Sequence, residues 1–91
     1  TAEADFLPRH GLDSSQLAAL FRWSEEEFLQ RTEGSPLRRA GYPRWLRNLA
    51  VGLGNAPSTI AVIEALELRR DDPSELVREH VAWALERHGR T

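Results

Sequence analysis

The apolar residues of this 91-residue chain recur at helical spacing, and no stretch shows the strict alternation of a strand. The clearest case begins at Pro43, where a helical wheel gathers apolar side chains on one face as far as about Leu53. This face consists of Trp45, Leu46, Leu49, Ala50 and Leu53. The opposite face carries Arg44, Arg47, Asn48 and Val51. The pattern predicts an all-α fold in which this helix is half buried.

Helix start and stop signals in the sequence predict two helices and one turn before the helix 43–53. A first helix is expected to start at Asp13 or Ser14, to include Leu17, Ala18, Leu20 and Phe21, and to end at Trp23. A second opens at Ser24, which forms a capping-box pattern with Glu27 and leads into a short helix. The acids of this run lie at the positive end of the helix dipole, which is a sufficient structural account of them. The segment 35–40 is expected to form one turn.

Two further helices are expected after the central one, from Ser58 to about Arg69 and from Asp72 to about His88. The first is apolar nearly all round, which predicts that neighbours enclose it. In the second, Asp72 is the predicted N-cap and Pro73 the first helical residue. Its core face is Val77, Val81, Ala84 and Leu85, widened by Leu76, His80 and Trp83.

The ending "DDPSELVREHVAWAL" resembles the second half of a HEAT repeat, in which an aspartate caps a helix that carries a Val-Arg pair. Arg78 is then expected to reach back or across to a neighbouring turn. One repeat cannot bury its own apolar face, so the helix 43–53 must supply the preceding layer. We therefore expect a short right-handed, HEAT-like α-α stack of about five helices. It forms a single domain over residues 13–91, with residues 1–12 as a linker or docked tail.

Composition and motif spacing exclude several classes of function. The chain has no cysteine, which excludes disulfides and thiolate ligation of an iron–sulfur cluster within it. Its three histidines lack the spacing of a zinc site, and neither a glycine-rich phosphate loop nor a Ser-His-acid signature is present. No catalytic, cofactor-binding or metal-ligating residue is assigned. No apolar run approaches the ~18 residues of a membrane span, and a cytoplasmic setting is expected.

One segment is basic in a chain whose net charge is -2. Residues 34–63 contain four arginines and no acid. The expected RNA-contacting residues are Arg38, Arg39, Tyr42, Arg44, Arg47 and Asn48. The arginines and the asparagine suit a phosphate backbone, and the tyrosine ring suits an unpaired base. The alternative is a solvated helix face whose compensating acids come from elsewhere in the fold.

Two strings together resemble a known family. "LRRAGYPRWLRNLAVGLGN" followed by "LVREHVAWAL" is similar to the C-terminal helical region of bacterial epoxyqueuosine reductases. The opening "FLPRHGLDSSQLAALFRWSEEEFLQRTEGSPLRRAG" also fits that region, so the resemblance covers nearly the whole chain. It implies a fragment of a larger enzyme that converts epoxyqueuosine to queuosine at the wobble position of certain transfer RNAs.

The resemblance also implies the partners and cofactors. The parent enzymes use cobalamin and two [4Fe–4S] clusters held in upstream domains, so no cofactor is expected in this fragment and no catalysis by it alone. The helical region is expected to hold the anticodon stem-loop of the tRNA. Two alternatives stay open: a packing domain that covers the cluster domain without touching RNA, and a free-standing HEAT-like protein–protein scaffold.

Overall fold

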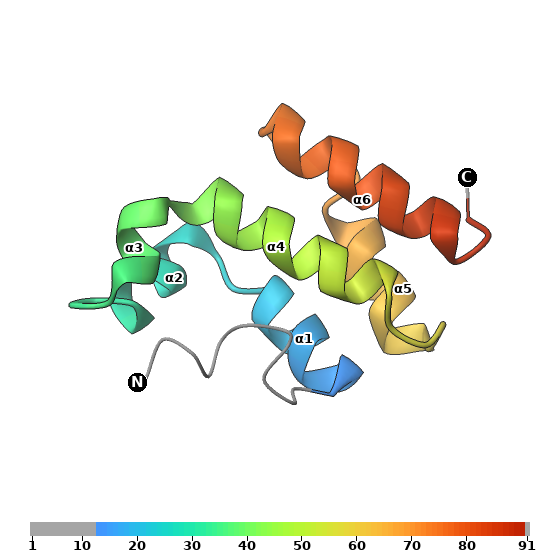
Figure 1. The fold of residues 1–91 in the computed structure, drawn as a ribbon, viewed down its shortest axis with the longest axis horizontal. Coiled ribbons are helices and arrows are strands. Elements are labelled where there is room, and N and C mark those ends of the chain that lie inside the picture. Colours follow the sequence, from blue (N-terminus) through green and yellow to red (C-terminus); the bar gives the residue numbers. More distant parts are fainter. Residues whose placement is uncertain (1–12, 91) are drawn as a thin grey trace.

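The computed structural model describes residues 13–90, which are all-helical and contain no strand (Figure 1). The helices are α1 (Ser14–Phe21), α2 (Glu25–Arg31), α3 (Pro36–Ala40), α4 (Tyr42–Gly54), α5 (Ile60–Leu68) and α6 (Glu75–Arg87). The predicted all-α stack is confirmed. The expected five helices become six because the segment expected to form one turn makes the short helix α3. The predicted tail, residues 1–12, lies outside the described residues, and the HEAT-like superhelix stays a prediction.

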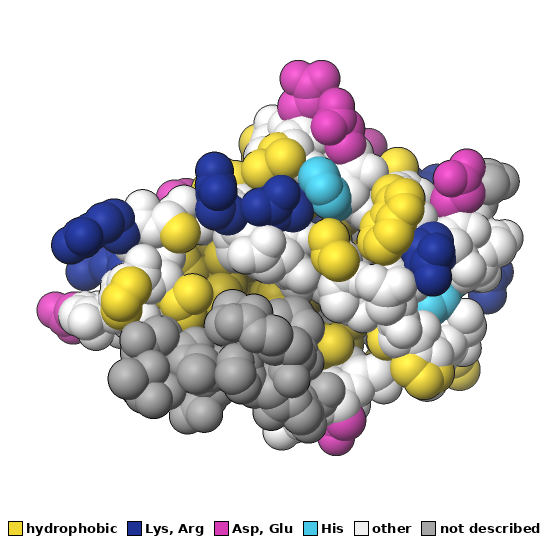
Figure 2. All heavy atoms as spheres, viewed as in Figure 1, with side chains coloured by type: hydrophobic (Ala, Val, Ile, Leu, Met, Phe, Trp, Pro, Cys, Tyr) yellow, Lys and Arg dark blue, Asp and Glu magenta, His cyan; other side chains and the backbone are white. Residues whose placement is uncertain are grey.

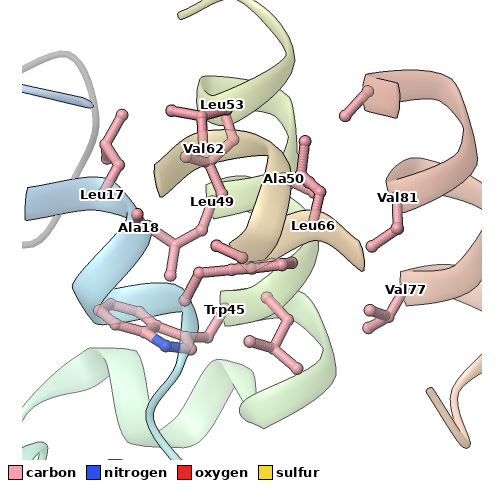
Figure 3. Packing of buried hydrophobic residues seen from close by; sticks show 14 of the residues in the cluster. Leu17, Ala18, Trp45, Leu49, Ala50, Leu53, Val62, Leu66, Val77 and Val81 are labelled. Carbon is pink, nitrogen blue, oxygen red and sulfur yellow. The ribbon is translucent and has the colours of Figure 1, made fainter. Parts of the chain in front are cut away.

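Helix α4 runs through the middle of the molecule and packs against α1, α5 and α6 (Figure 1). The apolar face predicted for it is confirmed, since all five of its residues are buried. Around this face lie buried side chains from the other three helices (Figure 3). They are Leu17, Ala18 and Phe21 of α1, Val62, Ala65 and Leu66 of α5, and Val77, Val81, Ala84 and Leu85 of α6. Full burial of one large aliphatic side chain contributes about 1.5–3 kcal/mol, so this core supplies most of the driving force for folding.

The start of α6 corrects a prediction. The helix begins at Glu75 and its N-cap is Ser74, whose hydroxyl accepts from the Val77 amide at 3.3 Å. Asp72 is not the cap because its carboxylate accepts from the Ser74 amide at 3.0 Å and so closes the preceding turn. Arg78 does reach back, as expected, and donates to the carbonyl of Asp72 at 2.7 Å.

The surroundings of α5 also differ from the prediction. The helix buries Val62, Ala65 and Leu66, but its other sides are open to solvent. Ile60 is 78% exposed and Leu68 is 67% exposed. A nearly uniform apolar sequence predicted enclosure, whereas α1, α4 and α6 cover one side of α5 only.

A single arginine ties the end of α1 to the turn after α5. Arg69, the residue after α5, donates from Nε to the Phe21 carbonyl at 2.7 Å and from Nη2 to the Trp23 carbonyl at 2.8 Å. Its Nη1 lies 3.4 Å from the carboxylate of Asp72. The guanidinium therefore fixes the end of α1 against the turn that leads into α6.

The end of α6 caps the end of α4 in a similar way. Arg87 donates from Nε to the Gly54 carbonyl at 3.1 Å, and Nε2 of His88 donates to the Leu53 carbonyl at 2.8 Å. Ser58 donates to Nδ1 of the same histidine ring, because the carbonyl on the other side must receive the ring proton. The last carbonyls of a helix have no partner within it, so these contacts join α4 and α6 at their C-terminal ends.

The contacts of Arg69 predict that replacing it lowers the free energy of unfolding, even when the replacement is lysine, which keeps the positive charge. Arg69→Lys loses the fork that reaches two carbonyls at once, and leaves part-buried acceptors without a donor. We expect a loss of about 2–3 kcal/mol in the free energy of unfolding, measured by denaturant titration. The matched control is Arg70→Lys, since Arg70 is exposed and, among residues 13–90, pairs only with Glu67, at 3.2 Å. Equal effects of the two changes would contradict the assigned role.

Candidate nucleic-acid interface

The first two predicted contact residues, Arg38 and Arg39, lie on the short helix α3 and are exposed. The N-cap Ser35 accepts from the Leu37 amide and so starts the helix at Pro36. With Gly34, Ser35 and Pro36, the two arginines line a shallow surface depression of about 460 Å³. The helix ends at Gly41, whose φ of 98° is a conformation that favours glycine and turns the chain into α4.

The other arginines lie on the outer face of α4, as predicted. Arg44 is exposed, while Arg47 and Asn48 are half-buried. Nε of Arg47 donates to Oδ1 of Asn48 at 2.9 Å, which holds the two side chains together on the helix surface. A phosphate offers acceptor oxygens, so any contact that Asn48 makes with it must come from its amide nitrogen.

The positive charge of these arginines is not neutralised within residues 13–90. The ion pairs of this part of the chain involve Arg31, Arg69 and Arg70, and none involves the four arginines of the segment 34–63. Figure 2 shows basic side chains gathered over α3 and along α4 on the viewed face. The compensating acids that the alternative interpretation requires do not pair with them within the described part of the molecule.

Tyr42 has a different environment from the arginines. Its hydroxyl donates to the Trp23 carbonyl at 2.5 Å, and its ring centroid lies 5.6 Å from that of Phe28. The guanidinium of Arg69 lies 5.6 Å from the ring centroid. These contacts give the half-buried ring a structural role at the junction of α2, α4 and α5. Stacking of Tyr42 on a base stays a prediction.

Sequence reasoning placed three residues of α6 at the edge of the core, and the structure places them at the surface. Leu76 is 36% exposed, Trp83 is 37% exposed and His80 is half-buried. They share one stripe of the helix, and His80 and Trp83 line a groove together with Val51 of α4. The sequence did contain a signal for this exposure. The apolar face predicted for α6 was too wide to be buried as a single face, so residues at its edge had to remain at the surface.

Neither a metal centre nor a membrane span is found in the described residues. No three His, Cys, Asp or Glu side chains within residues 13–90 come together in a group that could hold a metal ion. In the same stretch, every helix is too short or too polar to traverse a lipid bilayer.

Comparison with known proteins gives a consistent result. The epoxyqueuosine reductase of Pseudomonas aeruginosa is 77% identical over 91 residues, which cover 100% of this chain and 25% of that protein. The chain is similar to the C-terminal quarter of epoxyqueuosine reductases. The resemblance read from the sequence is thereby confirmed.

Other epoxyqueuosine reductases show the same pattern of coverage. The one from Xanthomonas campestris is 63% identical over 89 residues, or 98% of this chain and 25% of that protein. The one from Escherichia coli is 53% identical over 85 residues, or 93% of this chain and 22% of that protein. The chain thus spans about a quarter of the length of the curated relatives it matches. No protein-family model and no solved structure matches it.

The environment of Tyr42 predicts its titration. Burial raises the pKa of Tyr42 above its ordinary value of 10.0, although the positive charge of Arg69 opposes the rise. The folded state therefore binds the phenol proton more tightly than the unfolded state does. The protonated phenol therefore contributes to the free energy of unfolding. Its contribution is fully present below pH 10.0 and is lost as the pH rises through the pKa that Tyr42 has in the folded chain.

The measurement is direct because the chain has one tyrosine. Ultraviolet titration of the folded chain is expected to show tyrosinate forming above its ordinary pH range, and titration in denaturant is expected to restore the ordinary value. Tyr42→Phe serves as the control, since it abolishes the signal and is expected to destabilise the fold by about 1 kcal/mol. A folded chain that titrates at or below the ordinary value would refute the prediction.

Proposed function

We propose that this chain is the C-terminal helical part of an epoxyqueuosine reductase, and that it holds the anticodon stem-loop of a transfer RNA for that enzyme. The similarity to the reductases supplies the context. The observation that carries the RNA contact is the set of four arginines on α3 and α4 that form no ion pair within residues 13–90. Phosphate is the polyanion partner that such a surface fits.

The chemistry belongs to the rest of the enzyme in this proposal. The parent reductase converts epoxyqueuosine to queuosine, the last step of queuosine biosynthesis, in the cytoplasm. Cobalamin and two [4Fe–4S] clusters would be held by its upstream domains, which are the other partners of this chain. The chain has no cysteine and so offers no thiolate for a cluster. We therefore assign no step of the reduction to its residues.

In this proposal the arginines hold the phosphate backbone of the RNA and fix its position along the protein surface. Arg44 and Arg47 stand one helical turn apart on α4, while Arg38 and Arg39 lie across the Gly41 turn on α3. A guanidinium donates two parallel hydrogen bonds to one phosphate, and such contacts position a nucleic acid without reading its sequence. The base to be modified is then recognised by other parts of the enzyme.

The test removes two of these contacts. Arg44→Ala combined with Arg47→Ala is expected to weaken binding of an anticodon stem-loop whatever its loop sequence. The slope of log affinity against log salt is expected to fall by about 2, because roughly one counterion is released for each phosphate contact. Fluorescence anisotropy at two or more salt concentrations measures both quantities.

The control for this double variant removes the same amount of positive charge from a part of the chain outside the proposed interface. Arg22→Ala combined with Arg70→Ala also removes two exposed arginines, both outside the segment 34–63. This variant is expected to keep the affinity and the slope nearly unchanged. If the two double variants behave alike, general charge explains the binding and the proposed interface is wrong.

A second function, packing against the upstream domains, is favoured by the outer side of α5. Ile60 is 78% exposed and Leu68 is 67% exposed, and exposed apolar side chains on one helix suit a protein contact. Ile60→Ser combined with Leu68→Ser is expected to lower association with the separately produced upstream part at least several-fold. RNA binding by the chain is expected to be unchanged, and an unchanged association would count against this contact.

A further inference from the structure

The basic face of α4 leads into a groove between α4 and α6. Arg44, Arg47 and Val51 follow one stripe of α4, and Val51 lines the groove together with Glu79, His80 and Trp83. The groove has a volume of about 350 Å³. The two helices are joined at their C-terminal ends by Arg87 and His88, and the ribbons of α4 and α6 diverge toward their N-terminal ends (Figure 1). Figure 2 shows basic, histidine and hydrophobic side chains side by side along this seam.

The indole of Trp83 is held in place while part of its surface stays open. A Cβ atom added at Gly54 would lie 2.5 Å from Cζ3 of Trp83, so the ring rests against the backbone of α4. The guanidinium of Arg87 lies 5.3 Å from the ring centroid and is itself anchored to the Gly54 carbonyl. The side chain is nevertheless 37% exposed. A fixed and partly exposed indole is a stacking surface that needs little ordering when a flat ligand binds.

The polar groups of the groove suit a base better than a phosphate. Nδ1 of His80 donates to the Leu76 carbonyl at 2.8 Å, which leaves Nε2 as an acceptor without a partner among residues 13–90. Glu79 also lines the groove, and its carboxylate only accepts. Two acceptors match the amino group of a base edge, whereas a carboxylate repels a phosphate. Phosphate binding is therefore expected on the arginines, and a base is expected in the groove.

We propose that the α4–α6 groove receives an unpaired base stacked on Trp83, from an RNA strand whose phosphates lie on Arg44 and Arg47. The proposal rests on the proposed RNA-binding function and adds a base contact to it. The occupant is RNA rather than a protein segment because the stripe of α4 that contributes Val51 to the groove also carries Arg44 and Arg47, which form no ion pair in the described chain. Stacking on an aromatic side chain tolerates any base, so this contact favours unpaired loops over duplex.

The experiment compares two RNA probes on this chain, a hairpin with an unpaired loop and a blunt duplex of the same stem. Trp83→Ala is expected to weaken hairpin binding roughly tenfold and to leave duplex binding unchanged. Trp83→Phe, which keeps an aromatic ring, is expected to restore most of the affinity for the hairpin. Arg44→Ala combined with Arg47→Ala is expected to weaken both probes.

A second measurement does not depend on the stability of the variants. Ultraviolet crosslinking of the unaltered chain to a hairpin with photoreactive loop bases is expected to label the peptide that contains Trp83. The base contact would be overturned if crosslinks were confined to α3 and α4 and if Trp83→Ala changed neither hairpin nor duplex binding. The proposed contacts between the arginines and the phosphates would then still stand. Failure of the arginine variant to weaken either probe would overturn the proposed function itself. Loss of association with the upstream part in Trp83→Ala, with hairpin binding unchanged, would assign the groove to a protein and also overturn the proposal.

Discussion

The bonds from Arg69 to the carbonyls of Phe21 and Trp23 are the constraint on which the arrangement of the helices depends. The residues they join are 48 and 46 positions apart in the sequence. The Trp23 carbonyl also accepts from the Tyr42 hydroxyl at the start of α4. One carbonyl in the connection between α1 and α2 thus links the start of α4 to the end of α5. Since α4 carries both the arginines and Val51 of the groove, this point fixes where the basic face stands relative to the core.

The aromatic side chains around this junction give the site a rigid foundation. Trp23 stacks on Trp45 with ring centroids 5.5 Å apart, and Phe28 lies 5.4 Å from Trp45. Close aromatic pairs contribute about 0.5–1.5 kcal/mol beyond their buried area. The first turn of α4 is therefore held by rings from two other segments. Arg44 and Arg47 project from a supported helix and not from a loop, which suits groups that must hold a bound strand in register.

The sequence predicted the features that depend on local pattern and missed those that depend on distant partners. The buried face of α4 followed from its periodicity alone, and the exposure of Arg44 followed with it. Asp72 was a reasonable N-cap in sequence terms, but its carboxylate faces Arg69 and the Ser74 amide, a choice that only the folded chain decides. The surface position of Trp83 depends on how closely α6 approaches Gly54, and no local signal encodes that distance.

The uneven distribution of charge has a consequence for how quickly a polyanion finds this chain. The chain as a whole has a net charge of -2, although the segment 34–63 has no acid. Beyond a Debye length, about 8 Å at physiological ionic strength, salt screens the positive and the negative charges of the chain, so neither has much effect on an approaching nucleic-acid strand. Attraction begins only when α3 and α4 face the strand, so most collisions with other faces are unproductive. The association rate of this chain is therefore governed by orientation and not by total charge, and it is expected to lie below the rates that uniformly basic proteins reach.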